Sequence, residues 1–317
     1  MTQHKHTKVS KNKKMMRFKI KNLGQLFKIT FNEWYDKDPF RQSAIIAYYA
    51  IFSIPGVLVL IIAVAGYFFD RDIVNNNLIA QISETIGSEA ALQIQEVLSK
   101  STSEKSTTWG SIVGITILLI GATGVFVELQ KTLNLIWNVK VKPQSSIWLI
   151  IKSRLFSFGL ILAIAFLLTI SLVISTALVA ISNYIQFESS PFIMTIYGIL
   201  NFIISLLIIS ALFAMIFKIL PDAKIEWKHV WLGSLVTGIL FTLGKMSLAY
   251  YFGKAEPESV YGAAGSIILI LLWVSYSSMI LFFGAEFTAA YAKKYSGIIA
   301  PTAIAKVEVP TATEKTM

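Results

Sequence analysis

The sequence predicts an all-α, polytopic integral membrane protein with six transmembrane helices, and three observations favour this fold class. Of its 317 residues, 55% are hydrophobic and only 15% are charged, whereas soluble domains carry about 25% charged residues. Basic residues concentrate in alternate connections, as is typical of polytopic membrane proteins. Six apolar stretches are long enough to cross a bilayer, which takes about 20 residues; they cover approximately 42–69, 109–130, 155–184, 193–217, 230–252 and 262–290.

Residues 1–41 are predicted to form a basic cytoplasmic tail followed by an interfacial helix. Nine of the 28 lysines and arginines lie within the first 28 positions. This concentration favours contact with anionic lipid headgroups, and nucleic acid is not expected as a partner. Between Phe18 and Trp34, apolar residues recur at helical spacing with lysines between them. The pattern indicates an amphipathic helix on the inner membrane surface.

The membrane domain is predicted to cover residues 42–291, and its first span should remain in the mature protein. The apolar run that begins after Arg41 and ends at Phe69 exceeds the ~7 to 15 apolar residues of a signal peptide. Pro55 has no amide proton, so a bend is expected near Ser53, and the freed carbonyl groups could line a cavity. Alternatively, Pro55 is one of the prolines that membrane helices commonly contain.

The first outer connection, residues 70–108, contains two short amphipathic patterns. Apolar residues recur from Ile73 to Ile86 and again from Leu92 to Leu98, and Gly87 and Ser88 lie between them. We expect two short helices that cap the outer face of the membrane domain.

The distribution of lysine and arginine predicts that both termini are cytoplasmic. Connections rich in basic residues favour the cytoplasmic side, and the outer connections hold fewer basic than acidic residues. Residues 292–317, with Pro301 and Pro310, are predicted to be a disordered cytoplasmic tail. The inner basic residues beyond the N-terminal tail are Lys131, Lys140, Lys142, Lys152, Arg154, Lys218, Lys224, Lys228, Lys293 and Lys294.

Small residues within the spans predict close helix packing, because they let two helix backbones approach each other. The residues expected at such contacts are Gly121, Gly124, Gly262, Gly265 and Gly284.

Acidic residues are predicted to meet at the inner boundary of the membrane. Glu128 lies nineteen residues along span two, roughly 28 Å from its outer end, and Glu286 lies roughly 36 Å along span six. Asp222 follows span four. With neighbouring Arg41 and Lys131, these side chains could form a charged ring around an inward-facing vestibule, used for gating or substrate entry. Alternatively, each charge only holds its own helix at the headgroups.

Lys245 differs from the other charged residues because it lies fifteen residues into span five, in the outer half of the membrane. An uncompensated lysine at such a depth costs ~2.5 kcal/mol or more. Either its side chain extends outward to the headgroups, or it lines a water-filled path to an anion.

No enzymatic role is expected. The chain has no cysteine and three histidines, of which His4 and His6 lie in the tail and His229 lies far along the chain. Hydrolysis of RNA generally needs a metal-bound hydroxide or a set of acid and base side chains. We therefore predict no catalytic residue, no metal and no cofactor.

Four segments resemble the YihY/BrkB family of bacterial inner-membrane proteins, once labelled ribonuclease BN. They are AYYAIFSIPG in span one, IGATGVFVELQKTLNLIWNV from span two, ILPDAKIEW after span four, and YGAAGS with LLW, Tyr276 and GAE in span six, within about residues 25–295. Glu128 does not match the family pattern. The matching positions are Tyr48, Phe52, Ser53, Pro55, Gly121, Leu129, Asn134, Trp137, Pro221, Asp222, Trp227, Tyr261, Gly262, Gly265, Trp273, Gly284 and Glu286.

The resemblance implies a six-helix protein of the bacterial inner membrane, in a family often described as transporters, with some members linked to the movement of lipid-like molecules. A basic inner rim would attract phosphates or carboxylates, so the expected cargo is an anionic or lipid-like amphiphile. The residues expected to serve transport or gating are Ser53, Pro55, Glu128, Asn134, Asp222, Lys245 and Glu286. The alternatives are a non-transporting membrane scaffold or envelope-associated factor, and, least favoured, a ribonuclease.

Overall fold

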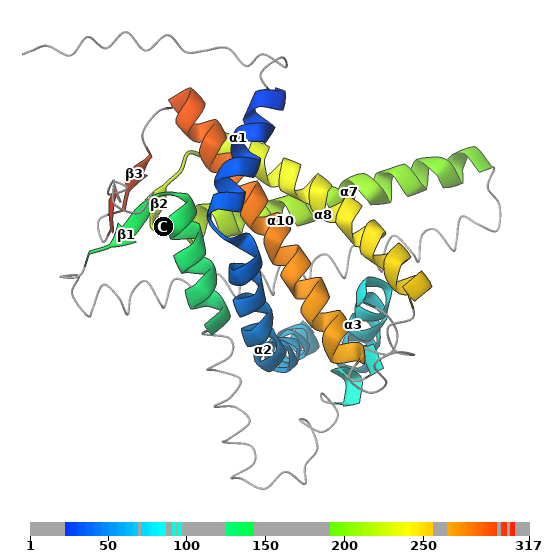
Figure 1. The fold of residues 1–317 in the computed structure, drawn as a ribbon. Helices are drawn as coiled ribbons and strands as arrows, with labels where there is room; N and C mark the ends of the chain where they lie inside the picture. Colours follow the sequence, from blue (N-terminus) through cyan, green and yellow to red (C-terminus); the bar gives the residue numbers. More distant parts are fainter. Residues whose placement is uncertain are drawn as a thin grey trace, which may run out of the picture.

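The computed structural model of the chain describes residues 23–68, 71–86, 91–92, 94–96, 124–142, 191–255, 265–296, 299–302 and 305–307. These residues are mostly helical (Figure 1). The helices are α1 Leu23–Asp36, α2 Pro39–Phe68, α3 Arg71–Ile86, α7 Pro191–Ile219, α8 Trp227–Ala255 and α10 Gly265–Ser296. A further helical stretch covers residues 124–136.

Three segments within the described residues are helical and are long and apolar enough to cross a membrane. They are Gly198–Ile219, Trp227–Leu248 and Ile267–Tyr295, and they lie within α7, α8 and α10. These helices coincide with the last three predicted spans, and α2 coincides with the first. The predicted span at 155–184 and most of that at 109–130 lie outside the described residues.

The outer surfaces of α7 and α8 suit contact with lipid. Phe202 and Leu207 on α7, and Leu243 and Met246 on α8, each expose about half or more of their surface. Large contiguous apolar surfaces on a folded chain are typical of proteins that contact a membrane or a partner.

Helices α8 and α10 run antiparallel, with glycines of one helix facing threonines of the other. A methyl group added at Gly233 would overlap Thr288, and one added at Gly284 would overlap Thr237. Each threonine hydroxyl donates to the glycine carbonyl oxygen four residues earlier in its own helix, at 2.7 Å. The polar groups are therefore satisfied within each helix, and the two backbones can approach closely.

Helix α1 packs along the C-terminal half of α10 (Figure 1). The ring of Phe27 lies 5.1 Å from that of Phe287, and Trp34 lies 5.9 Å edge-on to Phe283. The indole nitrogen of Trp34 also donates to the carbonyl oxygen of Met279 at 3.2 Å. The amphipathic pattern predicted around Phe18–Trp34 thus corresponds to a helix whose aromatic side chains are docked on α10.

Helix α3 accounts for the first of the two predicted outer helices. It contacts α2, α8 and α10, and its Val74 is buried. Residues 91–92 and 94–96 are also helical, with Ala91 and Ile94 buried. The predicted break at Gly87 and Ser88 lies outside the described residues.

Two short antiparallel β-ladders join the ends of several helices, so the described fold is not purely helical. Strand β1, Val139–Val141, pairs with β4, Ala305–Val307, and strand β2, Ala223–Lys224, pairs with β3, Ala300–Pro301. The segments that follow residues 124–136, α7 and α10 therefore meet at one end of the molecule. These segments contain the basic connections predicted to share the inner side.

The ladders differ from the predicted disordered tail over residues 292–317. Helix α10 continues to Ser296, and residues 300–301 and 305–307 are paired strands. Val139, Ala223 and Ala305 bury their side chains beneath the ladders. Burial of these small apolar side chains favours order here, and strands of two or three residues are too short to produce a recognisable alternation in the sequence.

Candidate functional site

The carboxyl group of Glu286 lies fully buried on α10 and forms an ion pair with Lys37. The Nζ atom of Lys37 is 2.6 Å from Oε1 of Glu286, and the side chain of Lys37 is only 20% exposed. Lys37 belongs to the short turn between α1 and α2. The ion pair therefore joins a candidate membrane span to the connection between two helices far earlier in the chain.

Local interactions fix the turn that carries Lys37. Asp38 has a φ of 51° and accepts hydrogen bonds from the backbone and the side chain of Arg41, so it caps the start of α2. Pro39 occupies the first position of that helix, where its missing amide proton costs nothing. The buried side chain of Gln42 donates to the carbonyl oxygen of Lys37 at 2.6 Å. Lys37 is thus held with its ammonium group directed at Glu286.

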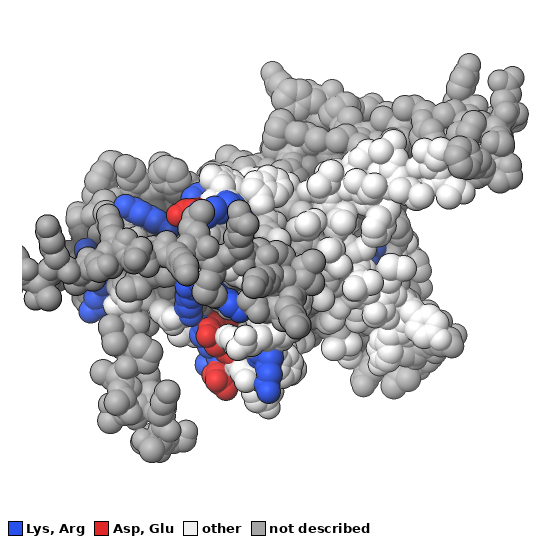
Figure 2. All heavy atoms as spheres, turned by 90° about the horizontal axis from the view of Figure 1, so that it is seen from above, with Lys and Arg blue, Asp and Glu red and all other residues white. Residues whose placement is uncertain are grey.

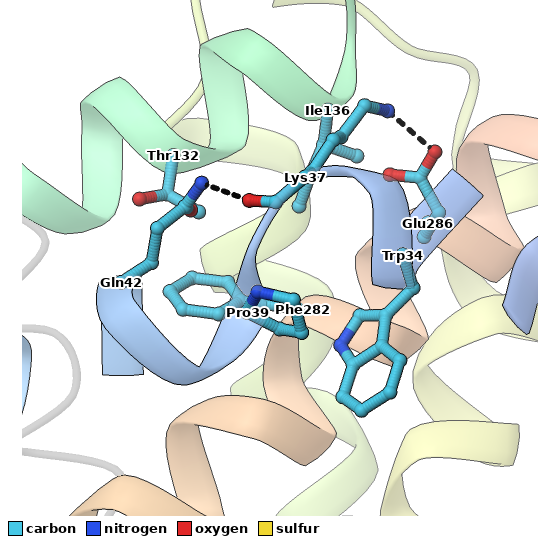
Figure 3. A pocket seen from close by; sticks show the side chains of 8 residues that line it. All are labelled: Trp34, Lys37, Pro39, Gln42, Thr132, Ile136, Phe282 and Glu286. Carbon is cyan, nitrogen blue, oxygen red and sulfur yellow. Dashed lines mark hydrogen bonds and ion pairs between the residues drawn. The ribbon is translucent and has the colours of Figure 1, made fainter. Parts of the chain in front are cut away.

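A small cavity adjoins the ion pair (Figure 3). Its volume of about 10 Å³ gives space for about one water molecule. Figure 3 shows that one oxygen of Glu286 meets Lys37 while the other points toward the middle of the pocket. The lining residues come from α1, the turn, α2, the helical stretch 124–136 and α10, and are Trp34, Lys37, Pro39, Gln42, Thr132, Ile136, Phe282 and Glu286.

The polar cluster extends from Glu286 to the surface through Glu33 and Lys293. Lys293 Nζ lies 3.3 Å from Oε2 of Glu33, and Glu33 lies close enough to Glu286 to influence its charge. Burial tends to raise the pKa of Glu33, but the contact with Glu286 and the positive charges of Lys293 and Lys37 outweigh it and hold that pKa below its ordinary value. Glu33 is therefore the ionised outer member of the cluster.

A second polar cluster surrounds Asp222 in the connection between α7 and α8. Asn134 donates to Oδ2 of Asp222 at 2.9 Å and accepts from its backbone amide at 2.7 Å, and Gln130 donates to the same oxygen at 3.2 Å. Burial raises the pKa of Asp222, and the hydrogen bond from Asn134 opposes the shift only in part. The cluster ties the helical stretch 124–136 to the end of α7.

The helical stretch 124–136 separates the two clusters. Thr132 and Ile136 line the cavity beside Glu286, whereas Gln130 and Asn134 bind Asp222. Residues two apart in a helix point in nearly opposite directions. Glu286 and Asp222 therefore lie in separate polar clusters, on opposite faces of this helical stretch.

The remaining predicted charged residues lie apart from these clusters. Glu128 pairs with exposed Lys131 at 3.3 Å, and Arg41 pairs with Asp38. Lys218 donates to the carbonyl oxygen of Ile225 and lies over the ring of Trp227. Arg154 lies outside the described residues. These contacts fit the alternative in which charged residues fix the positions of their own helices.

Other predicted site residues lie within helices. Ser53 is buried and donates to the carbonyl oxygen of Ala50, and α2 is a single helix that passes through Pro55. Lys245 is half-buried on α8. Asn134 contacts Asp222 as described above.

Among the predicted packing glycines, Gly284 faces Thr237, and Gly124 lies against the ring of Tyr49. Gly265 is buried at the start of α10. Gly121 and Gly262 lie outside the described residues. Close approach of helices thus occurs at two of the named glycines.

Sequence reasoning missed Lys37 as the ion-pair partner of Glu286, and the pair of Glu33 with Lys293 beside it. Glu33 and Lys37 are four residues apart, and Glu286 and Lys293 are seven apart, so each pair lies on one helix face. This spacing is a usable signal, but it does not reveal that the two faces meet. Among the described residues, no group of three histidine, aspartate or glutamate side chains is arranged to hold a metal ion.

Comparisons with known proteins identify the family. A family model described as Virulence factor BrkB matches residues 30–304. A UPF0761 membrane protein of Haemophilus influenzae is 27% identical over 271 residues, covering 84% of this chain and 94% of the relative. Another from Vibrio vulnificus is 24% identical over 257 residues, covering 78% and 76%. No solved structure matches the chain. The resemblance read from the sequence motifs is confirmed, and the chain belongs to the BrkB family of membrane proteins.

Proposed function

We propose that this chain is a transporter of an anionic, lipid-like amphiphile, and that α1 acts as a latch on the inner end of α10. The observation that carries the proposal is the ion pair between buried Glu286 and Lys37. It joins a candidate membrane span to the turn that follows α1. We further propose six spans with both termini cytoplasmic, which places the latch at the cytoplasmic face.

The ion pair is better suited to a reversible contact than to stability alone. Removing two charges from water costs several kcal/mol per ion, and well-packed apolar residues often stabilise a protein as well or better. The other contacts that hold α1 are its aromatic side chains, the hydrogen bond from Trp34 and the Glu33–Lys293 ion pair. The Lys37–Glu286 ion pair is thus one of several contacts that fix α1 to α10, and breaking it would weaken this attachment.

The charge distribution supports an anionic cargo with an apolar portion. Figure 2 shows lysine and arginine gathered on one side of the drawn face, with acidic residues among them, while the opposite side is mostly uncharged. A basic rim attracts anionic groups. The exposed apolar surfaces of α7 and α8 could contact the acyl portion of the same molecule.

The experiment is a lipid-movement assay with purified protein in vesicles. The probe is chain-labelled fluorescent phosphatidylglycerol, and chain-labelled phosphatidylcholine is the zwitterionic comparison. We expect the protein to move phosphatidylglycerol faster than protein-free vesicles do, and to move phosphatidylcholine less. Movement equal to that of protein-free vesicles for both probes would contradict the proposal.

Variants connect the assay to the latch. Exchange of both Lys37 and Glu286 for glutamine should change the rate of phosphatidylglycerol movement, because it removes the ion pair. The matched control is Lys131→Gln with Glu128→Gln, which removes an ion pair between neighbouring turns of the helical stretch 124–136 and should leave the rate unchanged. If the protein moves neither lipid while a stable partner co-purifies, the scaffold alternative is favoured.

A further inference from the structure

Two carboxyl groups, those of Glu33 and Glu286, lie in one cluster at the C-terminal half of α10, and each pairs with a lysine. Glu286 pairs with Lys37 at 2.6 Å, and Glu33 pairs with Lys293 at 3.3 Å. Ionised carboxylates only accept hydrogen bonds, so these two groups can bond to each other only when one of them takes up a proton. Independently, Oε2 of the fully buried Glu286 has no donor among the described groups.

We propose that Glu33 and Glu286 form a proton-binding site, which holds one proton between their carboxyl groups and controls the contact of Glu286 with Lys37. The proposed proton site rests on the positions of Glu33, Glu286 and their lysine partners, and does not depend on transport. The further statement that this proton drives cargo movement rests on the proposed transport function.

Within the described elements, the two glutamates have lysine side chains as their charged partners. Helix α1 and its following turn contribute Glu33 and Lys37, and α10 contributes Lys293. The cavity residues from α2 and from 124–136, Gln42 and Thr132, are uncharged, as is Thr237 of α8, which faces Gly284. The site thus holds two carboxylates and two ammonium groups, and its charges balance. One added proton neutralises one carboxylate and leaves the site with a net charge of one positive unit.

The two glutamates have different roles. The side chain of Glu33 is 37% exposed and that of Glu286 is fully buried. Because its neighbours hold the pKa of Glu33 below its ordinary value, Glu33 is the ionised acceptor and the bound proton lies on Glu286. Glu33 also gives solvent access to the site, and the adjoining cavity has space for about one water molecule.

The step is a simple proton transfer. A hydronium ion gives one proton to a carboxylate oxygen of Glu286, leaving water, and the new O–H group donates to Glu33. The reverse step returns the proton to water, and no electrons are transferred. Protonated Glu286 is neutral, so its contact with Lys37 loses its ionic part. As the pH falls through the titration, α1 should be held less tightly.

The test is pH-difference infrared spectroscopy of the full chain in vesicles without cargo. We expect a protonated carboxyl band that appears as the pH falls and that is lost in Glu286→Gln. Glu33→Gln removes a negative neighbour and should move the midpoint to lower pH. Lys37→Met removes a positive neighbour and should move it to higher pH. Shifts of about one pH unit correspond to tenfold changes in proton affinity.

Glu128→Gln is the matched control, since Glu128 pairs with Lys131 away from the site, and it should change neither the band nor its midpoint. A band that survives in Glu286→Gln would overturn the proposal, as would an unchanged midpoint in both Glu33→Gln and Lys37→Met. If Glu286→Gln does not fold, the opposite shifts in the other two variants decide.

Failure of the proton site and failure of the transport function are distinguishable. A titration with these shifts, but without lipid movement, supports the proton site and contradicts transport. Lipid movement without the titration supports transport and overturns the proton site.

Discussion

Lys37 and Glu286 lie 249 positions apart in the chain, and their contact depends on neighbouring side chains outside the pair. Asp38, Pro39 and Gln42 fix the turn, and the aromatic residues of α1 fix its position on α10. The charged pair is therefore held from both sides, and the effect of removing either charge should depend on what remains buried.

At the residue scale we predict that Lys37→Met is more destabilising than Glu286→Gln. The lysine variant leaves a buried carboxylate unpaired, which costs about 3–5 kcal/mol. We expect a cost at the lower end of this range, because the Lys37 side chain is 20% exposed and its ion pair is therefore partly solvated. The measurement is the free energy of unfolding in detergent, at a pH above the midpoint of the Glu286 titration so that its carboxyl group is ionised. The double variant should lose less than the sum of the single losses, and strict additivity would contradict the coupling.

Asp222 provides a second prediction at this scale. Its pKa is raised by burial, so the folded state binds this proton more tightly than the unfolded state. Its contribution to stability is full below the ordinary pKa of 3.8 and is lost as the pH rises through the folded pKa above that value. Asp222→Asn cannot ionise and should lack this decline. Unfolding free energies measured upward from pH 3.8 should therefore converge or cross for the two proteins, and parallel curves would contradict the assignment.

At the scale of elements, the contact between α8 and α10 depends on alternating glycine and threonine. Gly233 faces Thr288, and Thr237 faces Gly284. The same spacing of four residues on both helices lets each threonine satisfy its hydroxyl within its own helix.

We predict that Gly284→Ala destabilises the protein by about 1–3 kcal/mol, because the added methyl group overlaps Thr237 and overpacks the interface. Gly198→Ala on α7 is the control, since a methyl group there meets nothing within 4 Å. It should shift the thermal unfolding midpoint little. Adding Thr237→Ala to Gly284→Ala should restore part of the loss, because two of the three overlapping atoms are removed. Equal effects of the two glycine substitutions would be inconsistent with this packing.

Helices were predictable from the sequence where a long apolar run or a helical period was present. Helices α2, α7, α8 and α10 coincide with predicted spans, and α3 with a predicted amphipathic segment. Strands β1 to β4 were missed because two or three residues carry no measurable period. These strands are held in place by pairing between distant segments of the chain, such as Val139 with Val307.

The candidate site was predictable only in part for the same reason. Glu286 and Asp222 stood out as acidic residues at span ends, but their partners are chosen by packing. The docking of Phe27 and Trp34 on α10 brings Lys37 to Glu286. The opposite faces of 124–136 place Asn134 and Thr132 at different clusters. The position of a residue along its helix could be read from the sequence, whereas the direction in which its side chain points could not.

At the scale of the whole molecule, the β-ladders bring together the segments after 124–136, α7 and α10. We predict that all three lie in the cytoplasm. A reporter enzyme that works only in the cytoplasm should be active when it is inserted after Lys142 or fused after Met317. A reporter that works only outside the membrane should be inactive at both positions. A reporter inserted at residue 188 should be active only outside. The same outcome at all three positions would contradict the six-span arrangement.

The central claim is that α1 must leave α10 for cargo to move, and crosslinking tests it most directly. The natural chain has no cysteine, so Phe27→Cys and Phe283→Cys can be joined selectively by a short bismaleimide; their rings lie 6.2 Å apart. If α1 must leave α10, crosslinked protein in vesicles stops moving phosphatidylglycerol, whereas each single-cysteine variant treated with the same reagent remains active. Crosslinked protein that moves lipid at the uncrosslinked rate would contradict this claim.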